Sequence, residues 1–212
     1  MAKTTARRPE PARSADGPRR RMQAAERRAQ LLDVARRVFA TSGYHAASMD
    51  SVAREAGVTK PILYDHFPSK RDLYLSLLDA DLASLLGRVR SALASQKGNR
   101  ERIRASFQAY FDFVDEHAGG FQLLMQERVG AERQFRERVE AVRSLILSEV
   151  TALIQRESKG RLSRARSETV ALALVSMVEN VAQPDPGGAA ARRKDTVDTL
   201  VRLAWKGITG LT

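Results

Sequence analysis

Two short stretches of apolar residues at helical spacing, joined through a glycine, lie within residues 48–73 and constrain the fold more than any other feature. Ala53 falls on the apolar face of the first stretch and Leu63 on that of the second. Gly57 lies between them, and glycine readily takes the positive φ that a tight turn needs. Because small side chains are required where two helix backbones approach, the Ala53, Gly57, Leu63 spacing predicts a helix-turn-helix.

The second helix of this pair has its own start signals and a polar outward side. Thr59 can cap it, and Pro61 falls in its first turn, where a missing amide hydrogen costs nothing. Lys60, Tyr64 and His66 remain on the outward side, and the helix N-terminus carries partial positive charge. Such a helix fits the major groove of DNA, where residues near its start reach base edges and Tyr64 and His66 donate to phosphates.

Two residues outside the second helix extend this surface. Ser48 is placed to cap the first helix and to reach a phosphate. Lys70, in the first turn of the following helix, is placed to hold the DNA backbone again. The alternative interpretation is a helical hairpin with no role in nucleic-acid binding.

The combined pattern resembles the signature of TetR-family transcriptional regulators. The residues that carry the resemblance are Gly57, Val58, Lys60, Leu63, Tyr64, His66, Phe67, Ser69, Lys70 and Leu73. The resemblance implies an all-α fold of about nine helices, with an N-terminal three-helix helix-turn-helix head and a C-terminal helical body for ligand binding and dimerisation.

The resemblance also implies particular DNA contacts. It assigns base or groove contacts to Lys60, Pro61 and Ile62. It assigns phosphate contacts to Ser48, Tyr64, His66 and Lys70. Asp65 is left with two interpretations, because a carboxylate there accepts from a cytosine amino group or simply faces solvent.

Composition limits the class of protein. Hydrophobic residues make up 43% of the 212 residues, which supports a packed core, and the absence of cysteine excludes disulfides and thiolate metal sites. No apolar run approaches the roughly 20 residues that span a bilayer. We therefore expect a cytoplasmic protein with no membrane association, and its net charge of +11 suits an anionic partner.

Residues 1–21 are predicted to be a disordered basic tail. They hold seven Lys or Arg residues against two acidic ones and almost no large apolar side chain. Two interpretations stay open: an arm that lies along DNA or enters a minor groove, and a solvated leader that contacts nothing.

The remaining chain divides into a head, residues 22–69, and a body, residues 70–212. A helix over about 22–42, ended by Gly43, supports the head. A leucine stripe then predicts one helix from about residue 71 to 97 that leaves the head and continues into the body. The resemblance implies that a ligand which moves this helix moves the head.

A small-molecule cavity is predicted from aromatic and apolar side chains in the middle of the body. The candidates are Phe107, Tyr110, Phe111, Phe121, Leu124 and Met125. The alternative is that these side chains form ordinary core. The segments GYHAA, TKPILYDHF, LYLSLL and Phe111-x-Phe113 resemble actinobacterial members that regulate fatty-acid synthesis and sense long-chain acyl-CoA, which implies a hydrophobic or acyl-CoA effector.

The last two predicted helices, over about 164–183 and 190–210, are candidates for a homodimer interface. The middle of the first, TVALALVSMVENV, is apolar nearly all round and needs cover on more than one side. The interface residues predicted are Leu174, Val178, Val181, Val197, Val201 and Trp205. A two-fold pair of heads would read a palindromic operator, although both helices could instead cover only their own body.

No catalytic grouping is found, and we expect neither an enzyme nor a bound cofactor or metal. The acidic residues around His117 are adjacent on a helix and point in different directions. The sequence therefore predicts a ligand-responsive transcriptional regulator, a repressor, that binds double-stranded DNA. The rivals are a ligand-independent architectural DNA-binding protein and an enzyme or carrier built on the body.

Overall fold

The computed structural model describes residues 16–95, 98–117, 133–182 and 190–209. In these ranges all regular secondary structure is α-helical. The helices are α1 (Asp16–Ala46), α2 (Met49–Glu55), α3 (Lys60–His66), α4 (Lys70–Leu93), α5 (Asn99–Glu116), α7 (Arg133–Ser158), α8 (Arg164–Val181) and α9 (Ala190–Thr209). A predicted helix around residues 121–125 lies outside the described ranges.

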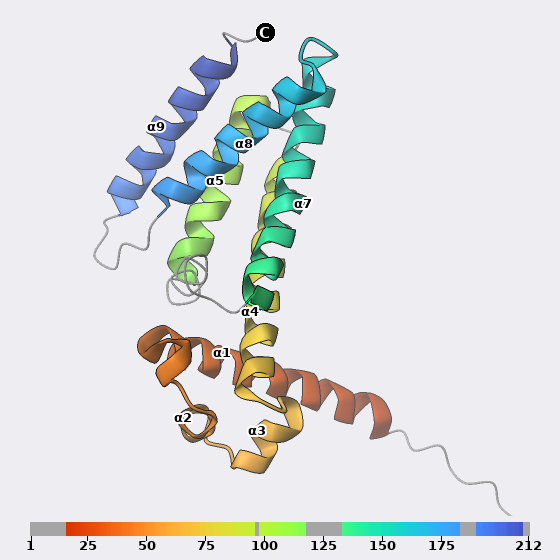
Figure 1. Ribbon diagram of the computed structural model, residues 1–212, viewed down its shortest axis with the longest axis vertical. Helices are drawn as coiled ribbons and strands as arrows, with labels where there is room; N and C mark the ends of the chain where they lie inside the picture. The colour runs from red at the N-terminus through yellow and green to blue at the C-terminus, as the bar shows by residue number, and fades with distance from the viewer. Residues whose placement is uncertain (1–15, 96–97, 118–132, 183–189, 210–212) are drawn as a thin grey trace, which may run out of the picture.

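The helices form two parts that share α4 (Figure 1). Helices α1, α2 and α3 make a head at one end, and α4 runs from it into a body with α5, α7, α8 and α9. Within the body α4 packs against α5 and α7, α7 packs against α8, and α5 packs against α9. This arrangement confirms the predicted all-α fold with an N-terminal helix-turn-helix head and a helical body.

Helix α1 is longer than the sequence predicts at its N-terminal end. It begins at Asp16, so part of the predicted tail is helical, and residues 1–15 lie outside the described ranges. Gly43 has φ 74° and ψ 165°, which are not helical, so the long helix stops there as predicted and a short helical piece follows to Ala46 across a kink.

The helix-turn-helix forms as its spacing predicts. Ala53 and Leu63 are buried at 3% and 0% exposure, where α2 crosses α3. Gly57 has φ 64°, and the amide of Val58 donates to the carbonyl of Ala53 at 3.0 Å. The turn thus depends on the left-handed conformation that glycine adopts without strain.

Head and body meet at a cluster of aromatic rings. The ring centre of Tyr74 on α4 lies 4.8 Å from that of Tyr44 on α1 and 4.7 Å from that of Phe135 on α7. Phe39 on α1 meets Tyr74 edge to face at 5.2 Å. The first turns of α4 are therefore packed into the head, while its later turns belong to the body.

Candidate nucleic-acid interface and ligand cavity

Helix α3 presents an outward face of mixed character. Leu63 and Phe67 point into the head core, at 0% and 1% exposure. Ile62 and Tyr64, which flank the buried Leu63, are 41% and 46% exposed. Lys60, Pro61 and Asp65 are also exposed. The predicted base-contacting residues therefore share one accessible surface.

Lys60 makes an ion pair across the turn. Its ammonium lies 2.7 Å from a carboxylate oxygen of Asp50 on α2, and both side chains are more than half exposed. A pair so exposed contributes little stability, because water and salt screen it. Lys60 can therefore leave Asp50 for a stronger anion at small cost.

Of the two predicted helix caps, the structure confirms the side-chain cap of Ser48 but not that of Thr59. Ser48 caps α2, since its Oγ accepts from the amide of Ser51 at 3.0 Å and the Ser51 hydroxyl completes a capping box. Thr59 occupies the N-cap position of α3, but its side chain makes no capping hydrogen bond. A cap accepts from the second or third amide of the helix, and Pro61 removes one of these donors.

Lys70 has a different role from the one that the sequence predicts. Its ammonium donates to the carbonyls of Tyr44, His45 and Ala47 at 2.9, 3.2 and 3.0 Å, and it lies over the Tyr44 ring. An ammonium has three hydrogens, so all are engaged at the end of α1. Lys70 thereby caps α1, and its phosphate contact stays a prediction.

His66, another predicted phosphate donor, is half-buried at the end of α3. Its ring lies 6.3 Å from that of Phe67, and its carbonyl accepts a hydrogen bond from Arg28. Tyr64 is the more accessible of the two predicted donors. The phosphate contacts of Ser48, Tyr64 and His66 also stay predictions.

The body encloses a cavity of about 270 Å³ between α4, α5, α7, α8 and α9. Apolar side chains dominate its lining: Leu82, Leu85, Val89, Leu93, Ile103, Phe107, Tyr110, Phe113, Val139, Val142, Ile146, Val150, Leu153, Ile154, Leu162, Leu174, Val175, Val178 and Trp205. The polar lining residues are Asn99, Arg102, Ser106, Arg143, Glu157, Ser158, Arg161 and Glu179.

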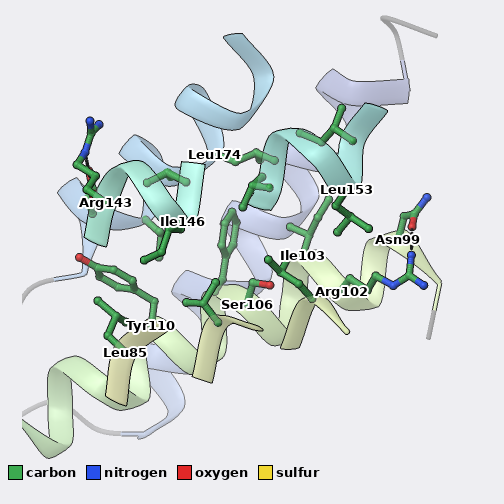
Figure 2. A pocket seen from close by; sticks show the side chains of 18 of the residues that line it. Leu85, Asn99, Arg102, Ile103, Ser106, Tyr110, Arg143, Ile146, Leu153 and Leu174 are labelled. Carbon is green, nitrogen blue, oxygen red and sulfur yellow. Dashed lines mark hydrogen bonds and ion pairs between the residues drawn. The ribbon is translucent and has the colours of Figure 1, made fainter. Parts of the chain in front are cut away.

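The polar groups gather at the two ends of the cavity (Figure 2). At one end Arg102 donates to Glu157 at 2.9 Å and joins α5 to α7. At the other, Arg143 on α7 donates to both carboxylate oxygens of Glu179 on α8, at 3.2 and 3.1 Å. Between them the lining is apolar, so the cavity suits a molecule with a long apolar part and a polar terminus.

Ser106 is an exception in the apolar middle. Its Oγ is enclosed and has no hydrogen-bond partner among the described residues, and Figure 2 shows Ser106 between the two polar ends. An unpaired buried hydroxyl costs about 1–3 kcal/mol. Sequence reasoning missed Ser106, because a lone serine in a helix carries no signal of a binding role.

Arg102, at the first end of the cavity, also affects the pKa of the Glu157 carboxyl. Hydrogen bonds from Arg102, and then from Asn99, hold the pKa of the Glu157 carboxyl below its ordinary value. Glu157 is therefore ionised in the folded protein and keeps Arg102 paired.

The structure places two of the six predicted ligand residues at the cavity, and their role in ligand binding stays a prediction. Phe107 and Tyr110 line the cavity. Phe111 is buried but is not part of the lining, because it faces α9, where the Arg193 guanidinium lies 4.9 Å from its ring centre. Phe121, Leu124 and Met125 lie outside the described residues. Sequence reasoning missed the contribution of α7, whose apolar stripe looks like ordinary core.

The predicted dimer residues are mostly buried within the single chain, and their role in a dimer stays a prediction. Leu174, Val178, Val197 and Val201 are at most 9% exposed within the single chain, and Trp205 lines the cavity. Val181 alone of the set is well exposed, at 43%. The sequence does not separate these cases, because an all-round apolar helix does not reveal which face its own body covers.

Other large apolar side chains occupy the outward side of these helices. Leu172 on α8 is 47% exposed and Leu203 on α9 is 60% exposed. Val181 lies nine residues from Leu172, which at 3.6 residues per turn places the two on opposite sides of α8.

The acidic residues near His117 each have a separate partner. Glu116 pairs with Arg88, Asp115 with Arg193, and Asp112 accepts from Gln108. His117 stacks on Phe113 at 4.5 Å. Among the residues that the structure describes, no group of His, Cys, Asp or Glu is placed to hold a metal ion. Nor is any helix there long and apolar enough to cross a membrane.

Comparisons with known sequence families match both parts of the chain. Residues 31–77 match the family described as "Bacterial regulatory proteins, tetR family". Residues 99–207 match the "Tetracyclin repressor-like, C-terminal domain".

Individual relatives agree. The HTH-type transcriptional activator FasR of Mycolicibacterium smegmatis is 37% identical over 99% of this chain and 95% of its own length. A TetR-like transcriptional regulator from Rhodococcus sp. RHA1 is 28% identical, with a TM-score of 0.71 over 88% of this chain and 97% of that one. AibR, solved with isovaleryl coenzyme A and operator DNA, has a TM-score of 0.67 at 19% identity over 84% and 97% of the two chains.

Proposed function

The chain belongs to the TetR family of bacterial regulatory proteins, and from this premise we propose that it binds one operator sequence with an affinity set by an acyl-CoA thioester in its body. The observation that carries the proposal is the path of α4. This helix begins in the head at Lys70 and lines the cavity with Leu82, Leu85 and Val89. A molecule in the cavity therefore contacts the helix that holds the head.

The outward face of α3 supports base reading. Lys60 and Ile62 lie near the start of the helix, where a major-groove helix meets base edges, and both are accessible. The same face includes the predicted contact Pro61 and the phosphate candidate Tyr64. We expect Lys60 to affect base preference and Tyr64 to affect affinity for all sequences.

The shape and chemistry of the cavity support an acyl chain. Its lining on α5 runs from Asn99 to Phe113, about 21 Å along the helix axis. This length exceeds what a short branched acyl group fills. Arg161 is part of the cavity lining and is exposed to solvent, so its guanidinium can meet the phosphates of a coenzyme A group. AibR, a member of the same fold, was solved with a coenzyme A thioester.

A homodimer supplies the second head that a palindromic operator needs. We propose that the outward sides of α8 and α9, with the exposed Leu172 and Leu203, form its interface. Exposed large apolar side chains gain most from burial against a partner. This surface consists of other side chains than the buried ones that the sequence predicts.

Repression and activation of transcription are the two candidates for how this protein regulates its target. The sequence predicts a repressor, whereas the relative that matches along nearly the whole chain is named an activator. A promoter fused to a reporter, measured with and without the gene for this protein, separates them. Repression predicts higher output when the gene is absent.

The proposal is tested with DNA first and ligand second. The purified dimer should enrich one palindromic sequence from random DNA, and should retain it over competitor DNA at moderate salt, which an architectural binder would not do. Stearoyl-CoA should then change the affinity for that sequence more than isovaleryl-CoA does. Equal effects of the two thioesters, or none, would contradict the assigned ligand.

A further inference from the structure

Arg28 on α1 makes three contacts, two at the C-terminal end of α3 and one on α4. One guanidinium nitrogen donates to the carbonyl of His66 at 3.1 Å, and the other donates to Oγ of Ser76 on α4 at 2.9 Å. The guanidinium carbon lies 4.2 Å above the ring centre of Phe67. One side chain therefore joins α1, α3 and α4.

The charge at the end of α3 and the planar shape of the arginine side chain make these contacts favourable. The last carbonyls of a helix lack partners inside the helix and carry partial negative charge, so a cation there is favourable. The planar guanidinium of arginine carries donors on separate nitrogens, so it can reach acceptors on two different helices while its flat face stacks on a ring, whereas a lysine ammonium is a compact point charge. Phe67 is 1% exposed, so the stacked contact is fixed to the head core.

Helix α3 needs such support from outside. It has seven residues, and a helix of this length is not stable by itself in water. Its N-terminal cap is incomplete, because the Thr59 side chain makes no hydrogen bond there. The orientation of α3 is therefore set by its packing and by the groups that hold its C-terminal end.

We infer that Arg28 is a positioning residue, which fixes the angle of α3 in the groove without touching base or phosphate. The inference rests on the proposed function, in which α3 reads the operator. Arg28 contacts the backbone of His66 and the buried ring of Phe67, whereas Lys60, Ile62 and Tyr64 form the outward face. Arg28 thus acts through α3.

The experiment compares R28A and R28K with R27A. Arg27 is the neighbouring arginine, exposed, with a single described contact to Gln30 at 3.3 Å, and R27A matches the loss of one positive charge. The DNA probe is the sequence that the unmodified protein enriches from random DNA, measured against unrelated DNA at several salt concentrations.

R28A and R28K should both weaken binding to the enriched sequence by about tenfold more than R27A does, the scale of one charge-assisted hydrogen bond. Binding to unrelated DNA and the salt dependence should match those of R27A. S76A, which removes the acceptor of one Arg28 guanidinium nitrogen, should give a smaller loss of affinity for the enriched sequence.

Two results would overturn the inference. One is an R28A protein that behaves as R27A does. The other combines two observations: R28K binds the enriched sequence as tightly as the unmodified protein, and R28A lowers the salt slope of binding by about one. That combination would identify Arg28 as a phosphate contact.

Amide hydrogen exchange separates failure of this inference from failure of the proposed function. The amide of Phe67 donates to the carbonyl of Leu63 at 2.9 Å in the last turn of α3. Its exchange should accelerate several-fold in R28A and R28K but not in R27A. If the unmodified protein enriches no sequence, the proposed function fails, and unchanged exchange would refute the role of Arg28 independently.

Discussion

Asp81 on α4 accepts a hydrogen bond of 2.6 Å from Arg36 on α1, and its carboxylate is enclosed in the protein with only 4% of the side chain exposed. Arg36 also donates to Asp33 on its own helix at 2.7 Å. Asp81 immediately precedes Leu82, which lines the cavity. The pair therefore joins the head to α4 where the cavity begins.

Removing one partner of this pair should have unequal effects. R36A leaves the Asp81 carboxylate buried without its partner, and we expect a loss of about 3–5 kcal/mol in the free energy of unfolding. D81N should cost less, because Arg36 keeps Asp33 and is 22% exposed to solvent. Urea denaturation of both variants measures the difference, with R37A as the control, since Arg37 makes an exposed pair with Glu55.

Filling the cavity should abolish the ligand response without damaging the fold. Val142 lines the cavity, so V142F adds volume where empty space exists. We expect stability within about 1 kcal/mol of the unmodified protein and operator binding that stearoyl-CoA no longer changes. L145F is the matched control, because Leu145 on the same helix is 46% exposed. A V142F protein with a normal stearoyl-CoA response would remove the ligand from this cavity.

Replacing Ser106 should affect stability and ligand binding in opposite directions. S106A removes an enclosed hydroxyl that has no partner, so the free protein should be equally stable or more stable by up to about 1 kcal/mol. A thioester whose polar atoms bond this hydroxyl would bind several-fold more weakly to S106A. Thermal shift and titration with stearoyl-CoA give the two values, and S106T tests whether restoring a hydroxyl restores affinity.

Charge on the outward face of the C-terminal helices should separate the subunits. Leu203 is 60% exposed, and L203R places a cation in the proposed interface. We expect a monomer by analytical ultracentrifugation that binds one half-site weakly. L174A should act differently: Leu174 is 9% exposed and lines the cavity, so the variant should stay dimeric but lose about 2–5 kcal/mol of stability.

Low pH should weaken the ion pair between Arg102 on α5 and Glu157 on α7. Hydrogen bonds from Arg102 and Asn99 lower the pKa of Glu157 below the ordinary value of 4.5. A lowered folded pKa gives stability that is present above the unfolded pKa and lost as pH falls through the folded one.

Stability should therefore decline below about pH 4.5, and E157Q should reduce the slope of that decline. Urea denaturation between about pH 3 and 7 measures it. E137Q is the control, because Glu137 pairs with Arg133 within one turn of α7 on the surface. Equal acid slopes in E157Q and the unmodified protein would refute the assignment.

Sequence reasoning succeeds where the determining contacts are local. The Ala53, Gly57, Leu63 spacing gives the helix-turn-helix because each contact spans at most ten residues, and Ser48 caps α2 through its neighbour Ser51. Lys70 is assigned another role because its acceptors lie 23 to 26 residues earlier in the chain. Periodicity contains no information on such distant acceptors.

The body shows the same limit. Periodicity predicts that α8 is apolar nearly all round, but the position of α7 decides which side it covers. Leu174 therefore lines the cavity, whereas Leu172, two residues away, faces outward. The cavity itself depends on gaps between side chains of five helices, and no single helix encodes it.

The carboxylate of Asp50 holds Lys60 at 2.7 Å when no nucleic acid is present. In the proposed complex Lys60 exchanges this carboxylate for a base edge, and because the exposed pair is weak the exchange costs little. The free protein thus keeps its base-reading cation paired without holding it back from DNA.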